Sequence, residues 1–241
     1  MDEEDQKPQV EKPINTGAAP TIVAFTFQFD RALNELFSSG APDRQVGIET
    51  LDDVAELVTN ADGTVVAKLE QDANTVQASG HPYQNSSRKL WHTLRVWLSH
   101  LADLKQYAET EFRLVTNVSV PSGSLVRRLA DAVSVTEVKT AVAALRQQAT
   151  EVLANEKSTA SKEASFVIQY ADEDLAYLIR CLKLSDNGGT ASGMPPREDT
   201  IQRFLLPSGL AAQGDDIYHH ILGVAVHRCR LAWEKGEAAW F

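Results

Sequence analysis

The sequence has few cysteines, and their scarcity excludes one class of protein. Cys181 and Cys229 are the only two in 241 residues, and both lie in apolar patterns with helical spacing. A small secreted domain held together by disulfides is therefore excluded. No Cys/His pair has the spacing of zinc ligands. We expect two buried thiols, which suit the reducing environment of the cytoplasm.

Long apolar runs are also missing. No segment approaches the roughly 18 apolar residues of a membrane span. The first residues are acidic, whereas the start of a secretory signal peptide is basic. We therefore expect a cytoplasmic protein with no membrane partner.

Positive charge is not in excess either. The formal net charge is −10, with 43% hydrophobic and 23% charged residues and a pI of about 5.1. This balance argues against sequence-blind binding of nucleic acid through a broad basic face, although a local basic groove stays compatible with it. The sequence also lacks a glycine-rich phosphate loop with its lysine, and a G-x-S-x-G nucleophile elbow.

What the sequence does contain is a stretch of strand patterns over residues 45–74. Apolar and β-branched residues predict strands over 45–49, 53–58 and 64–72. The segment 60–63, Asn-Ala-Asp-Gly, has the composition of a turn between the last two strands. Antiparallel pairing across that turn brings the start of one strand to the end of the other.

Acidic and amide side chains gather at these strand ends. One group precedes or opens the second strand, and the other closes the third strand: Glu49, Asp52 and Asp53, with Glu70, Gln71 and Asp72. One interpretation is an ordinary solvated hairpin end. The other is a site for a hard divalent cation such as Mg²⁺, which prefers oxygen ligands.

The remaining chain predicts a small α/β core followed by helices. Residues 1–20 are expected to form a flexible acidic tail, and 21–120 the core, with helices at 21–38 and 88–108 and a strand at 111–120. Residues 121–241 are expected to be a helical region that packs on the core or mediates assembly. In that region we expect helices from Ser134 to about residue 152, then over 157–170, 172–184, 197–206 and 215–235. A Gly/Ser/Pro loop over 185–196 is the clearest candidate for a mobile segment.

One face of the helix expected at 88–108 carries Arg88, His92 and Arg95. This row can be a solvated helix surface, or it can contact the phosphates of DNA. Three histidines on the last helix, His219, His220 and His227, are read as surface or interface residues.

The order helix, three strands, helix, strand is that of the restriction-endonuclease-like αβββαβ core with a mixed sheet. The segments FTFQFDRALNEL, GIETLDDV, LEQDANTV and SSRKLWHTLRVWL, within Phe25–Leu98, resemble the PD-(D/E)xK double-stranded-DNA endonuclease domain of bacterial anti-phage defence. This domain occurs in CBASS effectors that carry SAVED domains and in Lamassu systems.

The resemblance assigns roles to few positions. Asp53 matches the acid of the second strand, and Gln71 stands where the family has Glu, Asp or Gln. The lysine of the motif is replaced by Ala73. In this family the lysine is thought to orient or deprotonate the attacking water, which alanine cannot do. The chain is then either a deliberately inactivated variant, which we favour, or a natural pseudo-nuclease. Lys68 is out of step with the motif, and Lys89 is a candidate for a migrated base.

The resemblance also implies a mechanism and a cofactor. Asp53, Gln71 and the backbone near Asp72 would hold one or two Mg²⁺ (or Mn²⁺) ions for phosphodiester hydrolysis. Glu49 or Asp52 would complete the ligand shell or hold outer waters. Arg88, His92 and Arg95 would position duplex DNA.

The expected function is thus an endonuclease effector subunit of a defence complex. Its expected partners are double-stranded DNA, a sensor or ATPase subunit such as an SMC-like protein, and further copies of itself on activation. The alternative is a catalytically silent nuclease-fold binding module in a multi-subunit complex. A plain helical interaction protein is a third option, which predicts no metal binding.

Overall fold

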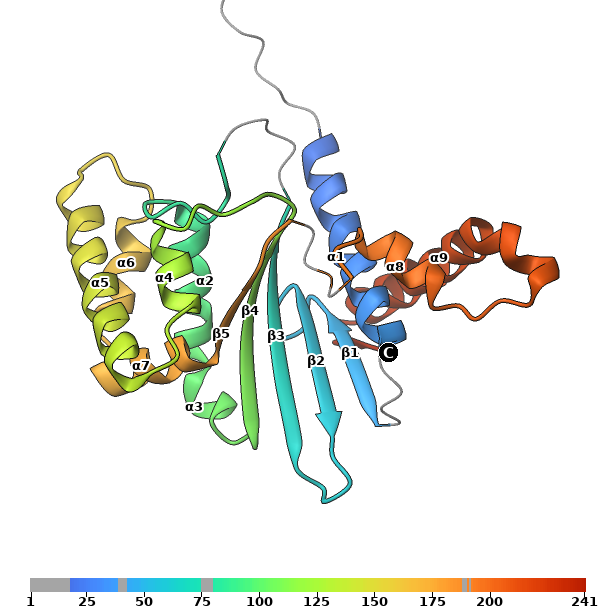
Figure 1. Cartoon of the computed structure of the whole chain (residues 1–241), viewed down its shortest axis with the longest axis horizontal. Coiled ribbons are helices and arrows are strands. Elements are labelled where there is room, and N and C mark those ends of the chain that lie inside the picture. The colour runs from blue at the N-terminus through green and yellow to red at the C-terminus, as the bar shows by residue number, and fades with distance from the viewer. Residues whose placement is uncertain (1–17, 39–42, 75–79, 188–189, 191) are drawn as a thin grey trace, which may run out of the picture.

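The computed structural model describes residues 18–38, 43–74, 80–187, 190 and 192–241. These residues form an α/β fold around a mixed sheet with the strand order β5-β4-β3-β2-β1-β6. Helices cover both faces of the sheet (Figure 1).

The antiparallel half of the sheet contains β1 (Arg44–Ile48), β2 (Val54–Thr59) and β3 (Val65–Ala73). The turn between β2 and β3 closes with a hydrogen bond from the Asn60 amide to the Thr64 carbonyl at 2.8 Å. Gly63 within it has a φ of 83°, which glycine adopts without steric cost. The register pairs Val54 with Glu70, so Asp53 lies next to the end of β3.

The parallel half contains β3, β4 (Glu109–Thr116) and β5 (Leu182–Ser185). Parallel neighbours need crossover connections, which are usually helical. The first crossover is α2 (Arg88–Ser99) with α3 (Leu101–Leu104). The second is α4 (Leu125–Ala130), α5 (Val135–Ala154), α6 (Ser161–Val167) and α7 (Asp172–Cys181). At the opposite edge, β6 (Ala239–Trp240) pairs with β1 in antiparallel fashion.

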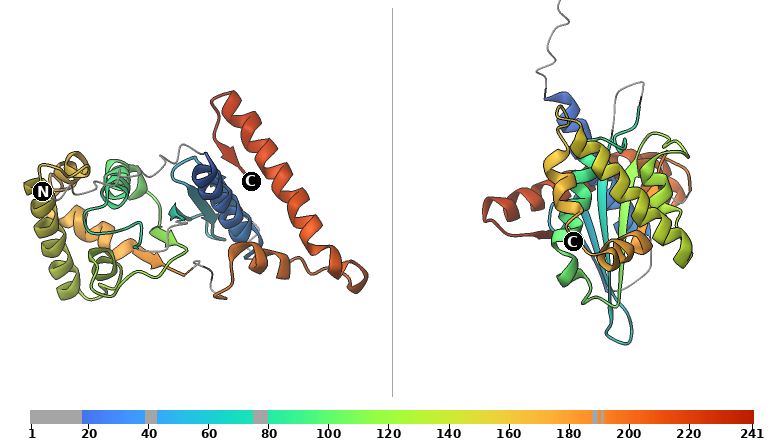
Figure 2. Two further views of the ribbon diagram at one scale, coloured as in Figure 1. Left: turned by 90° about the horizontal axis from the view of Figure 1, so that it is seen from above. Right: turned by 90° about the vertical axis from the view of Figure 1, so that its left-hand side faces the viewer.

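Each face of the sheet has its own core. Helices α2 and α4–α7 pack over β3, β4 and β5 around Trp91, Trp97 and Phe112, all fully buried. The other face is covered by α1 (Ala19–Ser38), α8 (Pro196–Gln202), η1 (Ser208–Gln213) and α9 (Gly214–Glu234). There Phe29 and Tyr218 belong to a second core. Figure 2 shows α1 next to the sheet and α9 outside α1.

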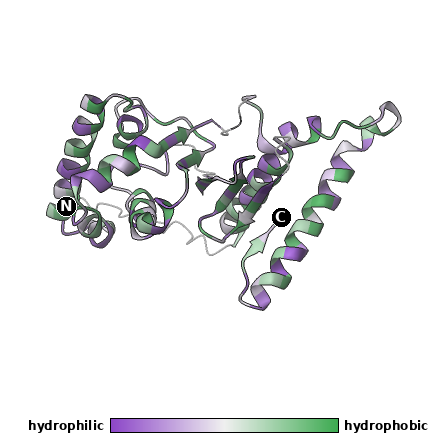
Figure 3. Ribbon diagram, turned by 90° about the horizontal axis from the view of Figure 1, so that it is seen from below, coloured by the Kyte–Doolittle hydropathy of each residue, from purple (hydrophilic) through white to green (hydrophobic). Residues whose placement is uncertain are grey.

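The outermost helix, α9, has both buried and exposed apolar residues. Tyr218 and Cys229 are buried against α1 and β1. Val224 and Leu231 remain 47% and 41% exposed on its outside, and Figure 3 shows hydrophobic residues along the length of this helix. Of the described helices, none combines the length and the apolar character of a membrane span.

Several boundaries differ from the sequence prediction. The helix expected over 88–108 breaks at His100 and ends at Leu104, and the strand expected over 111–120 spans Glu109–Thr116. Residues 182–184, predicted to be helical, belong to strand β5. Helix α4 and strand β6 were not predicted, and β5 and β6 join the region 121–241 to the sheet.

Two predicted flexible segments lie partly outside the described residues. Of the tail expected over 1–20, residues 1–17 are outside, and α1 already begins at Ala19. Of the loop expected over 185–196, residues 188–189 and 191 are outside, Ser185 ends β5 and Pro196 begins α8.

Candidate functional site

The candidate site begins where β2 and β3 lie side by side. The Gln71 side-chain amide donates a hydrogen bond to Oδ2 of Asp53. The backbone amide of Asp72 donates to the same oxygen at 2.8 Å. Asp53 and Gln71, which the sequence predicted to lie at the same end of a hairpin, are in direct contact.

Helix α2 forms the other wall of the site. The Lys89 ammonium donates a hydrogen bond to the main-chain carbonyl of Asp72. The Thr93 hydroxyl lies 3.4 Å from Oε1 of Gln71. The pocket between them has a volume of about 450 Å³ and is lined by Asp53, Gln71, Arg88, Lys89, His92 and Thr93.

The acids of this site are held in surroundings that disfavour their charge. Burial raises the pKa of Asp53, although the charge of Lys89 offsets part of the effect. The pKa of Asp52 is raised further, by burial and by the charge of Asp53, despite a hydrogen bond from the Trp97 indole. Burial and Asp53 also raise the pKa of Glu49. A bound cation would relieve this repulsion.

Ala73 is buried at the end of β3. Because alternate residues of a strand share a face, it lies on the same face of the sheet as Gln71. Ala73 does not itself line the pocket, and a lysine at this position would extend from the same face of β3 as Gln71. Lys68 does not replace it, because its ammonium pairs with Glu56 at 2.8 Å. Among the described residues, Lys89 is the lysine that lines the pocket. Its place there depends on the position of α2, and the sequence identified it only as a candidate for a migrated base.

The three residues predicted to bind DNA separate into two groups. Arg88 and His92 line the pocket, and both also face Glu163 on α6, at 3.4 Å and 4.0 Å. The Arg95 guanidinium instead lies over the Phe166 ring, 5.1 Å from its centroid. The structure thus brings Arg88 and His92 to Asp53 and Gln71, and places Arg95 against α6.

The oxygen atoms at the site fit one hard cation that takes the rest of its shell from water or phosphate. Among the described residues, no group of three His, Cys, Asp or Glu side chains is arranged to hold a metal ion. Mg²⁺, however, is often bound by one or two carboxylates together with substrate phosphates. Such donors are the Asp53 carboxylate, the Asp72 carbonyl and, once its side-chain amide is rotated by half a turn, the Gln71 amide oxygen. Asp52 and Glu49 lie close enough to act electrostatically on Asp53 or to respond to it.

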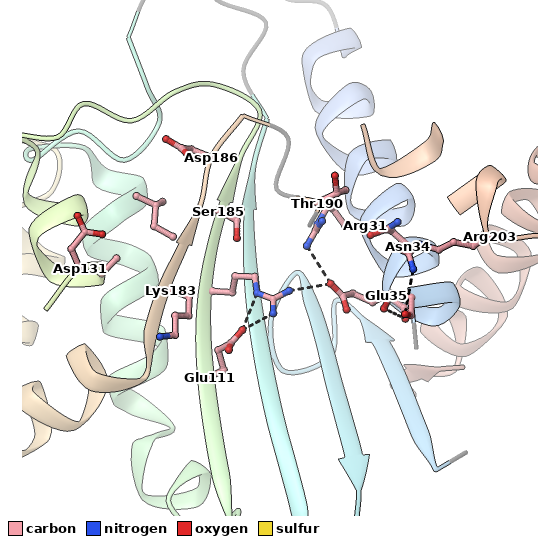
Figure 4. Close-up of a pocket in the computed structure, with 14 residues that line it drawn as sticks. Arg31, Asn34, Glu35, Glu111, Asp131, Lys183, Ser185, Asp186, Thr190 and Arg203 are labelled. Atoms are coloured by element: carbon pink, nitrogen blue, oxygen red, sulfur yellow. Dashed lines mark hydrogen bonds and ion pairs between the residues drawn. The ribbon is translucent and has the colours of Figure 1, made fainter. Parts of the chain in front are cut away.

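The opposite face of the same strands carries a second charged cluster. Arg31 on α1 donates two hydrogen bonds of 2.7 Å to Glu70. Arg113 on β4 pairs with Glu35 at 3.0 Å and with Glu111 at 2.6 Å (Figure 4). Burial lowers the pKa of Arg31, but Glu70 outweighs this effect and the net pKa is raised. The cluster borders a polar pocket of about 660 Å³.

Asp72 belongs to this second cluster through its side chain. The carboxyl group is buried, and burial together with the charge of Glu70 raises its pKa well above the usual value. The protonated form can donate a hydrogen bond to Glu70. Asp72 therefore contributes its backbone to the candidate site and its side chain to the opposite face.

Comparisons with known proteins give only distant likeness. The chain matches no protein-family model, and no curated protein sequence is significantly similar to it. Similar solved structures include the Cap4 SAVED/CARF-domain containing receptor of Acinetobacter baumannii with a cyclic trinucleotide, at 12% identity and a TM-score of 0.44, over 83% of this chain and 42% of that chain. The corresponding receptor of Moraxella osloensis has 12% identity and a TM-score of 0.41, over 83% of this chain and 43% of that chain. The chain therefore spans about two fifths of the length of these receptors, and at this distance the likeness assigns neither a family nor a function.

Proposed function

We propose that this chain is a restriction-endonuclease-like effector subunit of bacterial anti-phage defence, with a metal-dependent site for hydrolysing duplex DNA that Ala73 leaves inactive. The observation that carries the proposal is the contact between the Asp53 carboxylate and the Gln71 amide, beneath Lys89 of α2. The resemblance of residues 25–98 to defence nucleases supports the biological setting.

Some residues of the proposed site would bind the metal ion, and others would contact the DNA. Asp53, Gln71 and the Asp72 carbonyl are the proposed ligands of Mg²⁺ or Mn²⁺, which when bound would polarise the phosphate and lower the pKa of a water molecule. The Asp72 amide fixes Asp53, because it donates to one carboxylate oxygen at 2.8 Å. Arg88 and His92 line the pocket where they can contact backbone phosphates, so cleavage should depend little on sequence.

Ala73 lacks the amino group that the lysine of the motif would supply. Its methyl side chain can neither donate a hydrogen bond to the attacking water nor stabilise charge on phosphate. Lys89 does not take over the role of activating the attacking water in the observed arrangement, because its ammonium is bound to the Asp72 carbonyl. We therefore expect weak or undetectable cleavage by the chain as it stands.

The substitution Ala73→Lys tests this proposal. Restoring a group that acts on the attacking water should raise the rate of cleavage of linear duplex DNA in Mg²⁺ by about 10²–10⁴-fold. The matched control is Ala73→Lys combined with Asp53→Asn, which should return the rate to background. If the Ala73→Lys chain is folded and leaves DNA uncut in every oligomeric state that it forms, the nuclease proposal is wrong.

A second candidate function is a silent nuclease-fold module. The observation that favours it is the Lys89 ammonium at the Asp72 carbonyl, which neutralises part of the acid cluster without a metal ion. Such a module would dock through residues 121–241 to a sensor or SMC-like ATPase subunit, or to further copies of itself. It predicts that Ala73→Lys leaves DNA uncut and that Asp53→Asn does not change assembly.

A further inference from the structure

Lys89 lies at an unusual place for a cation. It is in the first turn of α2, directly after the N-cap residue Ser87 and Arg88, and this turn contains no acidic residue. The positive end of the helix dipole disfavours cations at that position. Something outside the helix must therefore offset the cost of placing Lys89 there.

The carboxylates of the candidate site offset the cost of placing Lys89 in the first turn of α2. The Lys89 ammonium is hydrogen-bonded to the Asp72 carbonyl and shares the pocket with Asp53 and Gln71. Its charge also favours the ionised forms of Glu49, Asp52, Asp53 and the Asp72 side chain. Lys89 thus serves as a counter-ion to carboxylates from the segment that precedes β2 and from β3.

We infer that the Lys89 ammonium occupies the cation position of the Asp53–Gln71 site, so that a divalent metal ion binds there only by displacing it. This inference rests on the metal site of the proposed function. An ammonium and a metal ion that shared the two lone pairs of the Asp72 carbonyl oxygen would lie close together and repel one another, as would any two cations among these carboxylates.

A DNA phosphate in the pocket could bind the displaced Lys89 ammonium. Its side chain is a flexible four-carbon stem that ends in three donors, and Arg88 and His92 border the same pocket. A DNA phosphate in the pocket would accept the ammonium as the metal ion takes its place. Metal and phosphate binding would then support each other, and metal alone would bind weakly.

Calorimetric titration with Mn²⁺ alone, without DNA, tests the inference. Lys89→Gln should lower the Kd for Mn²⁺ by about tenfold or more, because removing a nearby like charge has effects of this size on ionic equilibria. Lys89→Arg keeps the charge and should stay near the parent value. Lys105→Gln is a matched control, since Lys105 pairs with Asp174 away from the site. Thermal unfolding of each variant confirms that it is folded.

The substitution Asp53→Asn distinguishes failure of this inference from failure of the proposed function. Tighter binding by Lys89→Gln that disappears in Lys89→Gln with Asp53→Asn supports the inference. If Asp53→Asn abolishes Mn²⁺ binding while Lys89→Gln leaves the affinity unchanged or weaker, the metal site stands and the inference is wrong. If no variant binds Mn²⁺ through Asp53, both are wrong.

Discussion

The two faces of the sheet differ in whether their acidic side chains are paired with arginine. On the α1 face, Glu70 and Glu111 each have an arginine at 2.7 Å or less. On the α2 face, Asp52 and Asp53 lie close together, and the pKa of each is raised by burial. The same strand supplies both environments, because Glu70 and Gln71 are consecutive residues and point to opposite faces.

This contrast separates acids that maintain the fold from acids that are available for binding. A buried acid with a bidentate arginine gains little from a further cation. A buried acid without such a partner is destabilising unless a cation reaches it. We therefore expect substitutions on the α1 face to lower stability, and those at Asp53 to change binding instead.

Arg31→Met should have the largest effect on stability. It leaves buried Glu70 without its bidentate partner and with the longer contact to Arg113, at 3.4 Å, and breaking a buried pair in this way costs about 3–5 kcal/mol. Urea unfolding at neutral pH measures the loss. The double substitution Arg31→Met with Glu70→Leu should recover most of it, because no unpaired buried charge remains. A loss below about 1 kcal/mol for Arg31→Met alone would remove the distinction between the faces.

Asp199→Asn should have a smaller effect that depends on pH. Asp199 joins α8 to α1, since it accepts a 2.7 Å hydrogen bond from Asn34 and pairs with Arg203 at 2.8 Å. The substitution should cost about 1–2 kcal/mol at pH 7, because it weakens charge-assisted hydrogen bonds.

The sign of the pH dependence follows from the pKa of Asp199. Burial raises this pKa, but hydrogen bonds from Asn34 and Arg203 outweigh burial and hold it below the usual 3.8. Its stabilising contribution is therefore present above pH 3.8 and is lost as the pH falls through the lower folded-state pKa. Denaturant unfolding of the parent and of Asp199→Asn should show that the difference in their free energies of unfolding shrinks as the pH falls through the acidic range. A difference that does not change with pH would contradict this prediction.

Asp53→Asn should have the smallest effect on stability. A raised folded-state pKa means that ionised Asp53 opposes folding once the pH exceeds its unfolded value. Asparagine removes that charge and can still accept the hydrogen bond from the Asp72 amide. The free energy of unfolding at pH 7 should stay unchanged or rise by no more than about 1 kcal/mol. A large loss, measured in urea, would place Asp53 among the residues that maintain the fold.

The sequence was informative where the signal is local. The turn composition at residues 60–63 and the β-branched strands on either side predicted the pairing of β2 with β3, and hence the proximity of Asp53 and Gln71. Apolar residues at spacings of three and four predicted the helix over 21–38, with an apolar face of Phe25, Phe29, Leu33, Leu36 and Phe37. Phe29 and Leu33 are buried, whereas Phe25 and Phe37 are exposed. These features depend on periodicity and turn chemistry, which are encoded in short segments.

Features that depend on tertiary packing were harder to predict. Strand β5 is only four residues long and follows α7 without a turn, so Leu182 reads as the end of a helix. The pairing of Arg31 with Glu70 joins residues 39 positions apart in the chain. The position of Lys89 at the Asp72 carbonyl likewise depends on how α2 packs against the sheet, which no local pattern specifies.

Anomalous diffraction from crystals soaked in Mn²⁺ would show whether Asp53 and Gln71 form a cation site. We expect a manganese peak bound to Asp53 and to the side-chain oxygen of Gln71, at oxygen distances of about 2.0–2.3 Å, with the Lys89 ammonium moved away from the Asp72 carbonyl. A soaked crystal in which Lys89 keeps its hydrogen bond and no peak lies near Asp53 would contradict this expectation.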